Sequence, residues 1–205
     1  MEIFDGLVEL YQNVVPSPDL FIHHVLKEVE PHLKCQLTWS KGYPARSTQD
    51  HKMARFGEEG INYAFNGKQK PVVVWDPTGT LVFYRDLVDS WLDWKANCVV
   101  ANVYTPEGDL FPHRDSQLIP QLGNNPTIVS LSFGATRNFC VWELDSKGKR
   151  KTKQSNGRPF YQIPLHAGDM LILKNEFDQQ FHHGMRPEPA ANGLRLSLTY
   201  RKHHV

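Results

Sequence analysis

The sequence contains no apolar run approaching the roughly 18 residues of a membrane-spanning helix, so we expect no membrane partner. Its first residues, Met-Glu-Ile-Phe-Asp-Gly, are acidic and lack the basic segment of a secretory signal. Cysteine is scarce: Cys35, Cys98 and Cys140 are odd in number and widely spaced, which favours buried thiols in a reducing compartment over a disulfide framework. We therefore expect an intracellular protein, nuclear or cytoplasmic, and a monomer.

The chain also has no large excess of positive or negative charge. The 23 basic and 22 acidic residues leave a net charge of +1, so any attraction to nucleic acid must be local. The one biased segment is the lysine-rich run 147–153, and there is no internal repeat. A chain of 205 residues is expected to form a single domain, with residues 1–97 as an N-terminal part and residues 98–205 as the core.

Two amphipathic helices are predicted in the N-terminal part. The first begins at Ser17-Pro18, where a hydroxyl N-cap precedes a proline at the first helical position, and the second covers 81–95. Residues 35–70 look like short strands and loops. From Cys98 onward the apolar period changes to two, and strands are expected at 98–104, 127–133, 139–144, 159–165, 170–174, 181–185 and 194–201. This order predicts an α+β protein with a barrel-like or jelly-roll core braced by N-terminal helices.

A candidate metal site follows from two separated stretches. His113 and Asp115 are two residues apart, so in an extended segment their side chains point to the same face. His183 offers a third ligand from a distant part of the chain. Two histidines and one carboxylate are the ligand set of a non-haem Fe(II) centre with open coordination positions, while zinc is the chemical alternative. His182 is the alternative to His183 as the third ligand, and only one of the two can face the metal because they point to opposite faces of a strand.

Polar side chains near this set suggest a site for an anionic co-substrate. Arg195 and Arg201 share one face of an alternating strand, and a guanidinium is a planar fork that matches a carboxylate. Asn102 and Tyr104 share a face of an otherwise apolar strand, where polar groups are costly without a partner.

These residues resemble the AlkB family of Fe(II)/2-oxoglutarate-dependent dioxygenases. The motifs Asn102-x-Tyr104, His113-x-Asp115, His183-Gly and Arg195-x5-Arg201 fall in the family's order. The segments 56–67, 130–139 and 145–149 are similar to the branch that repairs alkylated duplex DNA, and the likeness covers roughly Arg55 to Lys202. The resemblance implies a double-stranded β-helix (jelly-roll) core.

The resemblance also implies an activity. Fe(II), 2-oxoglutarate and O2 would support the oxidative removal of an alkyl group from a nitrogen of a nucleic-acid base, as in DNA repair. His113, Asp115 and His183 would hold the iron. The residues Asn102, Tyr104, Arg195, Ser197 and Arg201 would bind 2-oxoglutarate, with Arg195 on its distal carboxylate. Ser197 stands where the family usually has Asn.

The implied substrate residues lie in three places. Tyr63, Phe65 and Asn66 match the segment that walls a flipped base, although such aromatics also serve as core. Lys147 and Lys149 match a DNA-contacting hairpin, and the alternative is a solvated turn.

Gln117 departs from the family pattern, because enzymes that act on 1-methyladenine or 3-methylcytosine usually have an acid there.

DNA is favoured as the partner. An RNA demethylase, a protein hydroxylase with the same core and a non-catalytic binding module are the alternatives.

Overall fold

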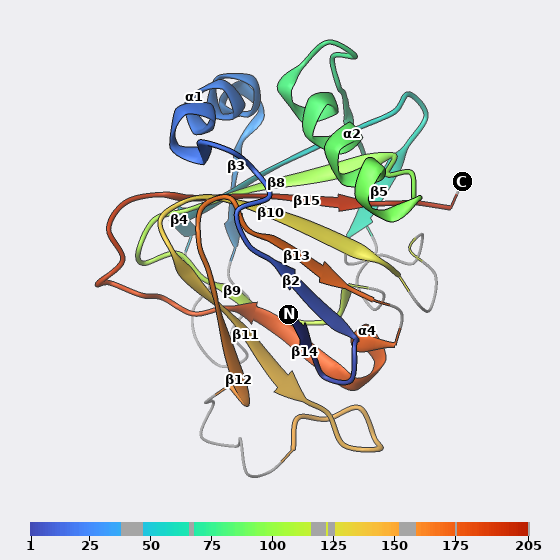
Figure 1. Ribbon diagram of the computed structural model, residues 1–205, viewed down its shortest axis with the longest axis vertical. Helices are drawn as coiled ribbons and strands as arrows, with labels where there is room; N and C mark the ends of the chain where they lie inside the picture. The colour runs from blue at the N-terminus through green and yellow to red at the C-terminus, as the bar shows by residue number, and fades with distance from the viewer. Residues whose placement is uncertain are drawn as a thin grey trace.

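The computed structural model describes residues 1–37, 47–65, 68–115, 122, 126–151, 159–174 and 176–204. For residues 36–37, 47–49, 64–65 and 68–70 only the backbone is described. Two mainly antiparallel sheets face each other, and two helices cover the outer face of the larger sheet (Figure 1). The expected α+β jelly-roll core with bracing helices is thereby confirmed.

The larger sheet combines strands from both ends of the chain. Its order is β1 (Glu2–Ile3), β2 (Val8–Tyr11), β13 (Met170–Leu173), β10 (Ile128–Gly134), β15 (Arg195–Arg201), β8 (Cys98–Tyr104), β4 (Ser47–Gly57) and β3 (Lys34–Leu37), with β7 (Val73–Val74) parallel to β4. The smaller sheet has the order β12 (Tyr161–Leu165), β11 (Arg137–Glu143), β14 (Phe181–Met185) and β9 (Leu110–His113). β5 (Asn62–Phe65) and β6 (Lys68–Pro71) form a separate hairpin.

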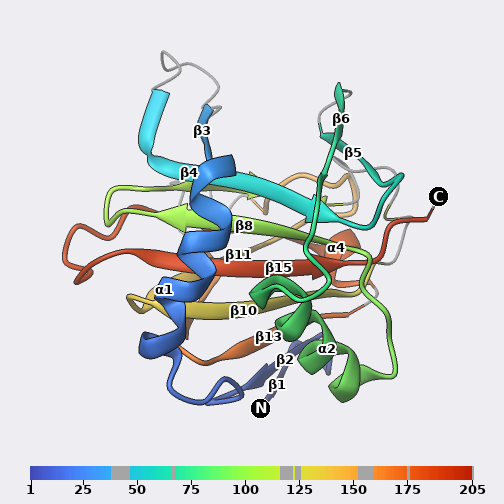
Figure 2. The ribbon, with the colours of Figure 1, turned by 90° about the horizontal axis from the view of Figure 1, so that it is seen from above.

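The helices α1 (Pro18–Val29) and α2 (Thr80–Leu92) lie side by side across the larger sheet (Figure 2). Their buried residues, such as Val25 and Val88, pack in one cluster with Leu196 and Leu198 of β15. A 3-10 turn (Glu30–His32) follows α1, and the short helix α4 (Phe177–Gln180) precedes β14. Among the described residues, no helix is both long and apolar enough to cross a bilayer.

The predicted helices are confirmed, with two corrections at their ends. Ser17 precedes the first helix as expected, but it has left-handed dihedrals (φ 48°, ψ 51°) and its side chain makes no capping hydrogen bond. Pro18 at the first helical position has a φ angle already suited to the helix. The second helix ends at Leu92 rather than at residue 95, because Asp93 has a φ of 45° and leaves the helical region.

Most strands lie where the period-two pattern predicts them, within two residues at either end. The prediction was wrong for the N-terminal part in two respects. β2 was not expected, yet it pairs with β13 inside the larger sheet. Residues 47–57, expected as short pieces over the core, form the long strand β4, which pairs with β8 over seven residue pairs. Both errors have the same cause: β2 and β4 are strands because they pair with distant segments, and sequence periodicity does not report such pairing.

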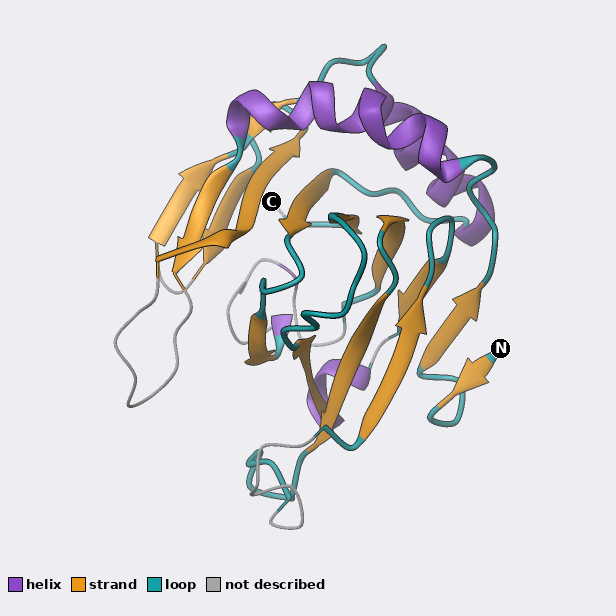
Figure 3. Cartoon of the chain, turned by 90° about the vertical axis from the view of Figure 1, so that its left-hand side faces the viewer, coloured by secondary structure: helices purple, strands orange, loops and turns teal. Residues whose placement is uncertain are grey.

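β15 shows how the fold positions the functional residues. Leu196, Leu198 and Tyr200 face the helices, and the Tyr200 hydroxyl donates a hydrogen bond to the carbonyl of Leu81 at 2.7 Å. The alternate residues, Arg195 and Arg201 among them, face the smaller sheet. A second apolar cluster, which includes Val141, Leu171 and Phe181, fills part of that space. Figure 3 shows the two sheets facing each other, and the polar residues described next come from strands of both.

Candidate metal centre

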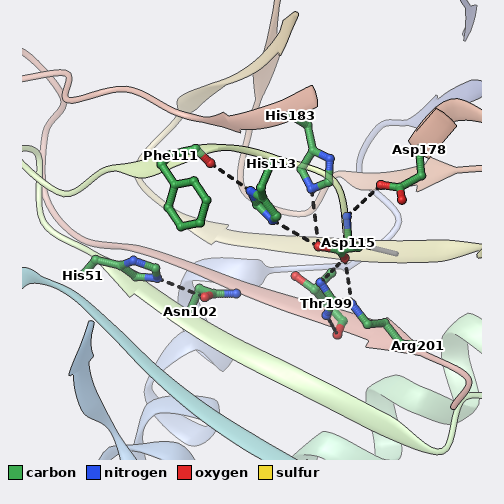
Figure 4. A network of polar contacts seen from close by, with 9 residues as sticks. All are labelled: His51, Asn102, Phe111, His113, Asp115, Asp178, His183, Thr199 and Arg201. Carbon is green, nitrogen blue, oxygen red and sulfur yellow. Dashed lines mark hydrogen bonds and ion pairs between the residues drawn. The ribbon is translucent and has the colours of Figure 1, made fainter. Parts of the chain in front are cut away.

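The structure brings His113, Asp115 and His183 together, and all three are buried. His113 ends β9, and His183 is its direct partner in the neighbouring strand β14. The Nε2 atoms of His113 and His183 lie 3.1 Å and 3.8 Å from Asp115 Oδ1, and the donor atoms of all three residues lie within 4.8 Å of one another (Figure 4). Three ligands from two strands and the following turn therefore face one point.

His113 is held so that its Nε2 atom faces Asp115. Its Nδ1 atom lies 2.8 Å from the carbonyl oxygen of Phe111, and a carbonyl only accepts, so Nδ1 carries the proton. Nε2 is then the ring nitrogen left to act as a metal ligand, and it faces Oδ1 of Asp115. Two electron-rich atoms at this distance fit a cation between them.

Asp115 is fixed by contacts that leave one oxygen for a metal. Nε and Nη2 of Arg201 donate to Oδ2 at 2.9 Å and 2.6 Å, and the Asp115 backbone N–H donates to Asp178 Oδ1 at 2.8 Å. Burial alone would raise the pKa of Asp115, but Arg201 and the two histidines outweigh it and hold that pKa well below its usual range. The carboxylate is therefore ionised, as a metal ligand must be.

His183 is kept neutral by its surroundings. Burial, followed by the nearby His113, lowers the pKa of His183 to about 3, although Asp115 acts in the opposite direction. Phe139 stacks on the ring with centroids 5.4 Å apart. His182 points to the other face of β14, where Trp142 is its direct partner in β11. Geometry thus favours His183 over His182 as the ligand.

Arg195 has the features of an anion-binding residue. Its side chain is 2% exposed, and Nη2 donates to Ser132 Oγ at 3.0 Å. Nε and Nη1 are buried and have no hydrogen-bond partner among the described residues. Burial lowers the pKa of Arg195 to about 10. Since buried donors without acceptors are costly, the carboxylate of an anionic co-substrate fits here.

Arg201 has a different environment from the one that the sequence predicts. All three guanidinium nitrogens are engaged: Nε and Nη2 by Asp115, and Nη1 by the carbonyl of Thr199 at 3.0 Å. Arg201 therefore supports a candidate metal ligand, and its contact with the co-substrate stays a prediction. The alternation of β15 gives the correct face, but the partner of Arg201 depends on the loop that carries Asp115.

The other expected co-substrate residues line up across three strands. Tyr104 of β8 lies opposite Arg195 of β15, and Asn102 lies opposite Ser197. On the other side of β8, Tyr104 lies opposite His51 of β4, a buried residue that the sequence analysis missed. Only the pairing of β4 with β8, invisible in the local pattern, places His51 there.

The expected substrate residues are less uniformly placed. Tyr63 is 3% exposed, with Arg55 over its ring at 4.9 Å and the His203 ring centroid at 5.1 Å. Phe65 ends β5, and its side chain is not described. Asn66 and Gln117 lie outside the described residues.

Lys147 and Lys149 are exposed in a turn after β11, at the end of the molecule away from α1 and α2 (Figure 1). Their backbone N–H groups both donate to Asp145 Oδ1 at 2.9 Å. The tight turn directs a lysine-bearing tip into solvent. Lys151, in the same hairpin, forms an ion pair with Glu143.

Arg137 is a second buried residue that the sequence analysis missed. Its guanidinium donates to the carbonyls of Thr105 and Gly108 at 2.8 Å and of Arg186 at 2.6 Å. The first two lie in the connection to β9, and the third follows β14, so Arg137 ties together the segments next to both histidine-bearing strands. Its position in an apolar strand is the only signal in the sequence.

Comparison with known proteins agrees with this geometry. The family model of the 2OG-Fe(II) oxygenase superfamily matches residues 21–201. Human DNA oxidative demethylase ALKBH2 is 29% identical over 152 residues, which cover 74% of this chain and 56% of the human protein. Mouse alpha-ketoglutarate-dependent dioxygenase alkB homolog 3 is 34% identical over 204 residues, which cover 97% of this chain and 64% of the mouse protein. The chain thus spans between about half and two thirds of the length of these relatives.

Solved structures show the same fold at low sequence identity. The structure of OsALKBH1 has a TM-score of 0.58 at 16% identity and covers 96% of this chain and 98% of that one. A 2OG-Fe(II) oxygenase family oxidoreductase from Burkholderia pseudomallei has a TM-score of 0.60 at 14% identity, with 95% and 84% covered. The matched family model, the two AlkB relatives and the clustered triad converge: the chain belongs to the 2OG-Fe(II) oxygenase superfamily and, within it, to the AlkB family.

Proposed function

We propose that the protein is an Fe(II)- and 2-oxoglutarate-dependent dioxygenase that removes alkyl groups from nitrogens of nucleic-acid bases, with DNA as the favoured substrate. The observation that carries this proposal is the pairing of a buried His-Asp-His triad with a buried arginine, Arg195, whose Nε and Nη1 have no hydrogen-bond partner among the described residues. DNA is favoured because the human relative is named a DNA oxidative demethylase.

In this proposal His113, Asp115 and His183 hold the iron, and Arg195 binds the distal carboxylate of 2-oxoglutarate. When bound, iron and 2-oxoglutarate together activate O2 for oxidation of the alkyl carbon. The chain's own part is structural: Arg201 fixes the Asp115 carboxylate, the Phe111 carbonyl fixes the His113 ring, and burial excludes water from the centre. Asn102, Tyr104 and Ser197 line the same three-strand region as hydrogen-bonding groups.

The nucleic acid would approach from the side of the basic hairpin. Lys147 and Lys149 contact phosphates in this proposal, and the alkylated base leaves its stack to reach the iron. A tRNA demethylase of fission yeast, 25% identical over 142 residues that cover 64% of this chain and 41% of that protein, makes RNA the second candidate substrate. An intracellular monomer stays our prediction for the state in which the protein works.

The test is incubation with Fe(II), 2-oxoglutarate and O2 and a panel of DNA and RNA oligonucleotides that each carry one methylated base. Mass spectrometry should show loss of the methyl group together with formation of succinate. The matched control is Asp115→Asn, which keeps the shape of the side chain but removes its charge, and which should abolish both products. Oxygen added to a peptide, with every oligonucleotide left intact, would favour a protein hydroxylase and contradict the proposal. Formation of succinate without loss of a methyl group from any oligonucleotide would show that the assignment of nucleic acid as the substrate is wrong.

A further inference from the structure

His51 contacts both members of the Asn102–Tyr104 pair. It lies in β4 directly opposite Tyr104, and its side chain is 2% exposed. Its Nε2 atom is 3.0 Å from Asn102 Oδ1 (Figure 4), and its ring stacks on Tyr104 with centroids 4.3 Å apart and planes 17° apart. A buried histidine with two such contacts has one orientation available to it.

The direction of the hydrogen bond fixes the Asn102 amide. Oδ1 is a carbonyl oxygen and only accepts, so His51 Nε2 donates. Burial lowers the pKa of His51 to about 4, although the hydrogen bonds to Asn102 and to the backbone of Asp109 act in the opposite direction, so the ring is neutral at pH 7. With its oxygen occupied, Asn102 offers its NH2 group to any further partner.

The strands around this contact are held at the neighbouring residues. The Thr105 backbone N–H donates to the Asp50 carbonyl, and the Thr105 hydroxyl donates to Asp50 Oδ1, both at 2.8 Å. Gly108 packs so closely that an added Cβ would lie 2.2 Å from the Asp50 carbonyl oxygen. The contacts of Asp50, next to His51, and of Thr105, next to Tyr104, thus fix the register of β4 and β8, and this register keeps His51 beside Asn102.

We propose that His51 is a positioning residue for the co-substrate: by donating from Nε2 to Asn102 Oδ1 and stacking on Tyr104, it turns the NH2 group of Asn102 toward the oxygen atoms of a 2-oxo acid. This inference rests on the proposed function, because it takes 2-oxoglutarate as the ligand of the region between Asn102 and Arg195. His51 itself does not touch the co-substrate.

The test measures the dissociation constant of 2-oxoglutarate by calorimetry on Mn(II)-loaded protein, without turnover. His51→Phe keeps a ring for stacking but removes the donor, and should raise that constant about tenfold, the size expected when a hydrogen bond to a charged group is misaligned. His51→Gln supplies a donor again and should recover most of the affinity. His24→Phe, on α1 at the outer face, is the matched control and should bind as the wild type does. His51→Leu also lacks a donor and replaces the phenylalanine variant if that variant does not fold.

A double-mutant cycle separates positioning from general damage. In an Asn102→Ala background, His51→Phe should cause no further loss of affinity, because the amide that it orients is gone. Unchanged affinity in His51→Phe, or an equal loss in both backgrounds, overturns the inference while the proposed function stands. Failure of the wild-type protein to bind 2-oxoglutarate overturns the proposed function and this inference with it.

Discussion

His182 and His183 have the same side chain and opposite surroundings. His183 faces Asp115 between the sheets, whereas His182 lies on the far face of β14 beside Trp142. We predict that His183→Ala lowers the affinity for Mn(II) or Fe(II) by at least about 100-fold, since one of three ligands is lost, and that His182→Ala leaves it within about threefold. Metal titration followed by calorimetry checks both variants. The opposite ranking would assign the ligand to His182 and contradict the geometry.

At the residue scale, the sequence identifies groups whose spacing is local or whose order matches a family. His113 and Asp115 share a face because they are two residues apart, and Arg195 and Arg201 alternate correctly along β15. Contacts that depend on pairing between distant strands were not predictable: the bond from His51 to Asn102 spans 51 residues and the bond from Arg201 to Asp115 spans 86.

At the scale of elements, the turn after β11 projects two lysines that make no ion pair in the described part of the chain. We predict that the double variant Lys147→Ala/Lys149→Ala weakens oligonucleotide binding and lowers the slope of log Kd against log salt by about 1.5, because two phosphate contacts are lost. Fluorescence anisotropy over a salt series measures this slope. The double variant Lys27→Ala/Lys95→Ala, on the helical side, serves as the control. Equal slopes in both double variants would show that nucleic acid does not contact the hairpin.

Arg137 connects distant segments, since it donates to three carbonyls in two segments and its Nε atom lies 3.6 Å from Glu188 Oε1. Arg137→Met has a similar length but no donors, so the three buried carbonyls lose their partner, and we expect a loss of roughly 3 kcal/mol in the free energy of unfolding. Urea denaturation measures the loss.

The control is Arg85→Met, because Arg85 pairs with Asp86 and Asp89 near the surface and such pairs contribute under about 1 kcal/mol. If both arginine variants lose the same stability, Arg137 does not connect the two segments in the way the hydrogen bonds indicate.

At the scale of the whole molecule, buried neutral histidines make stability depend on pH. Burial, helped by the nearby Arg201, lowers the pKa of His203 to about 4, and burial lowers that of His51 to about 4, against 6.5 in an unfolded chain. The unfolded state therefore binds more protons between these values. The stabilisation is complete above about pH 6.5 and is lost as the pH falls toward 4.

We predict that each of these two histidines reduces the free energy of unfolding by about 2 kcal/mol between pH 7.5 and pH 5. His203→Phe and His51→Phe should each remove about that amount from the pH dependence measured in urea. A double variant whose stability falls with pH as steeply as that of the wild type would show that these rings are not the source.

The overall architecture was predictable as far as it depends on periodicity. The change to a period of two at Cys98 gives β8, β14 and β15 of the site but not β9, which carries His113, and the apolar stripes give both helices. Sheet order was not predictable, because β2 joins β13 across about 160 residues and β4 joins β8 across 41 to 53. Apolar alternation specifies which face of a strand is buried, but it does not specify which other strand lies beside it in the sheet.

The two faces of β15 have a consequence for how this protein tolerates change in length. Since Arg195 and Arg201 alternate with Leu196 and Leu198, deleting or adding a single residue within the strand would carry the guanidinium groups into the apolar layer beneath α1 and α2, and leucines into the polar interior. Insertions and deletions should therefore be confined to the connections before Leu194 and after Lys202. The seven residues of β15 must therefore keep their number, even where individual side chains are substituted.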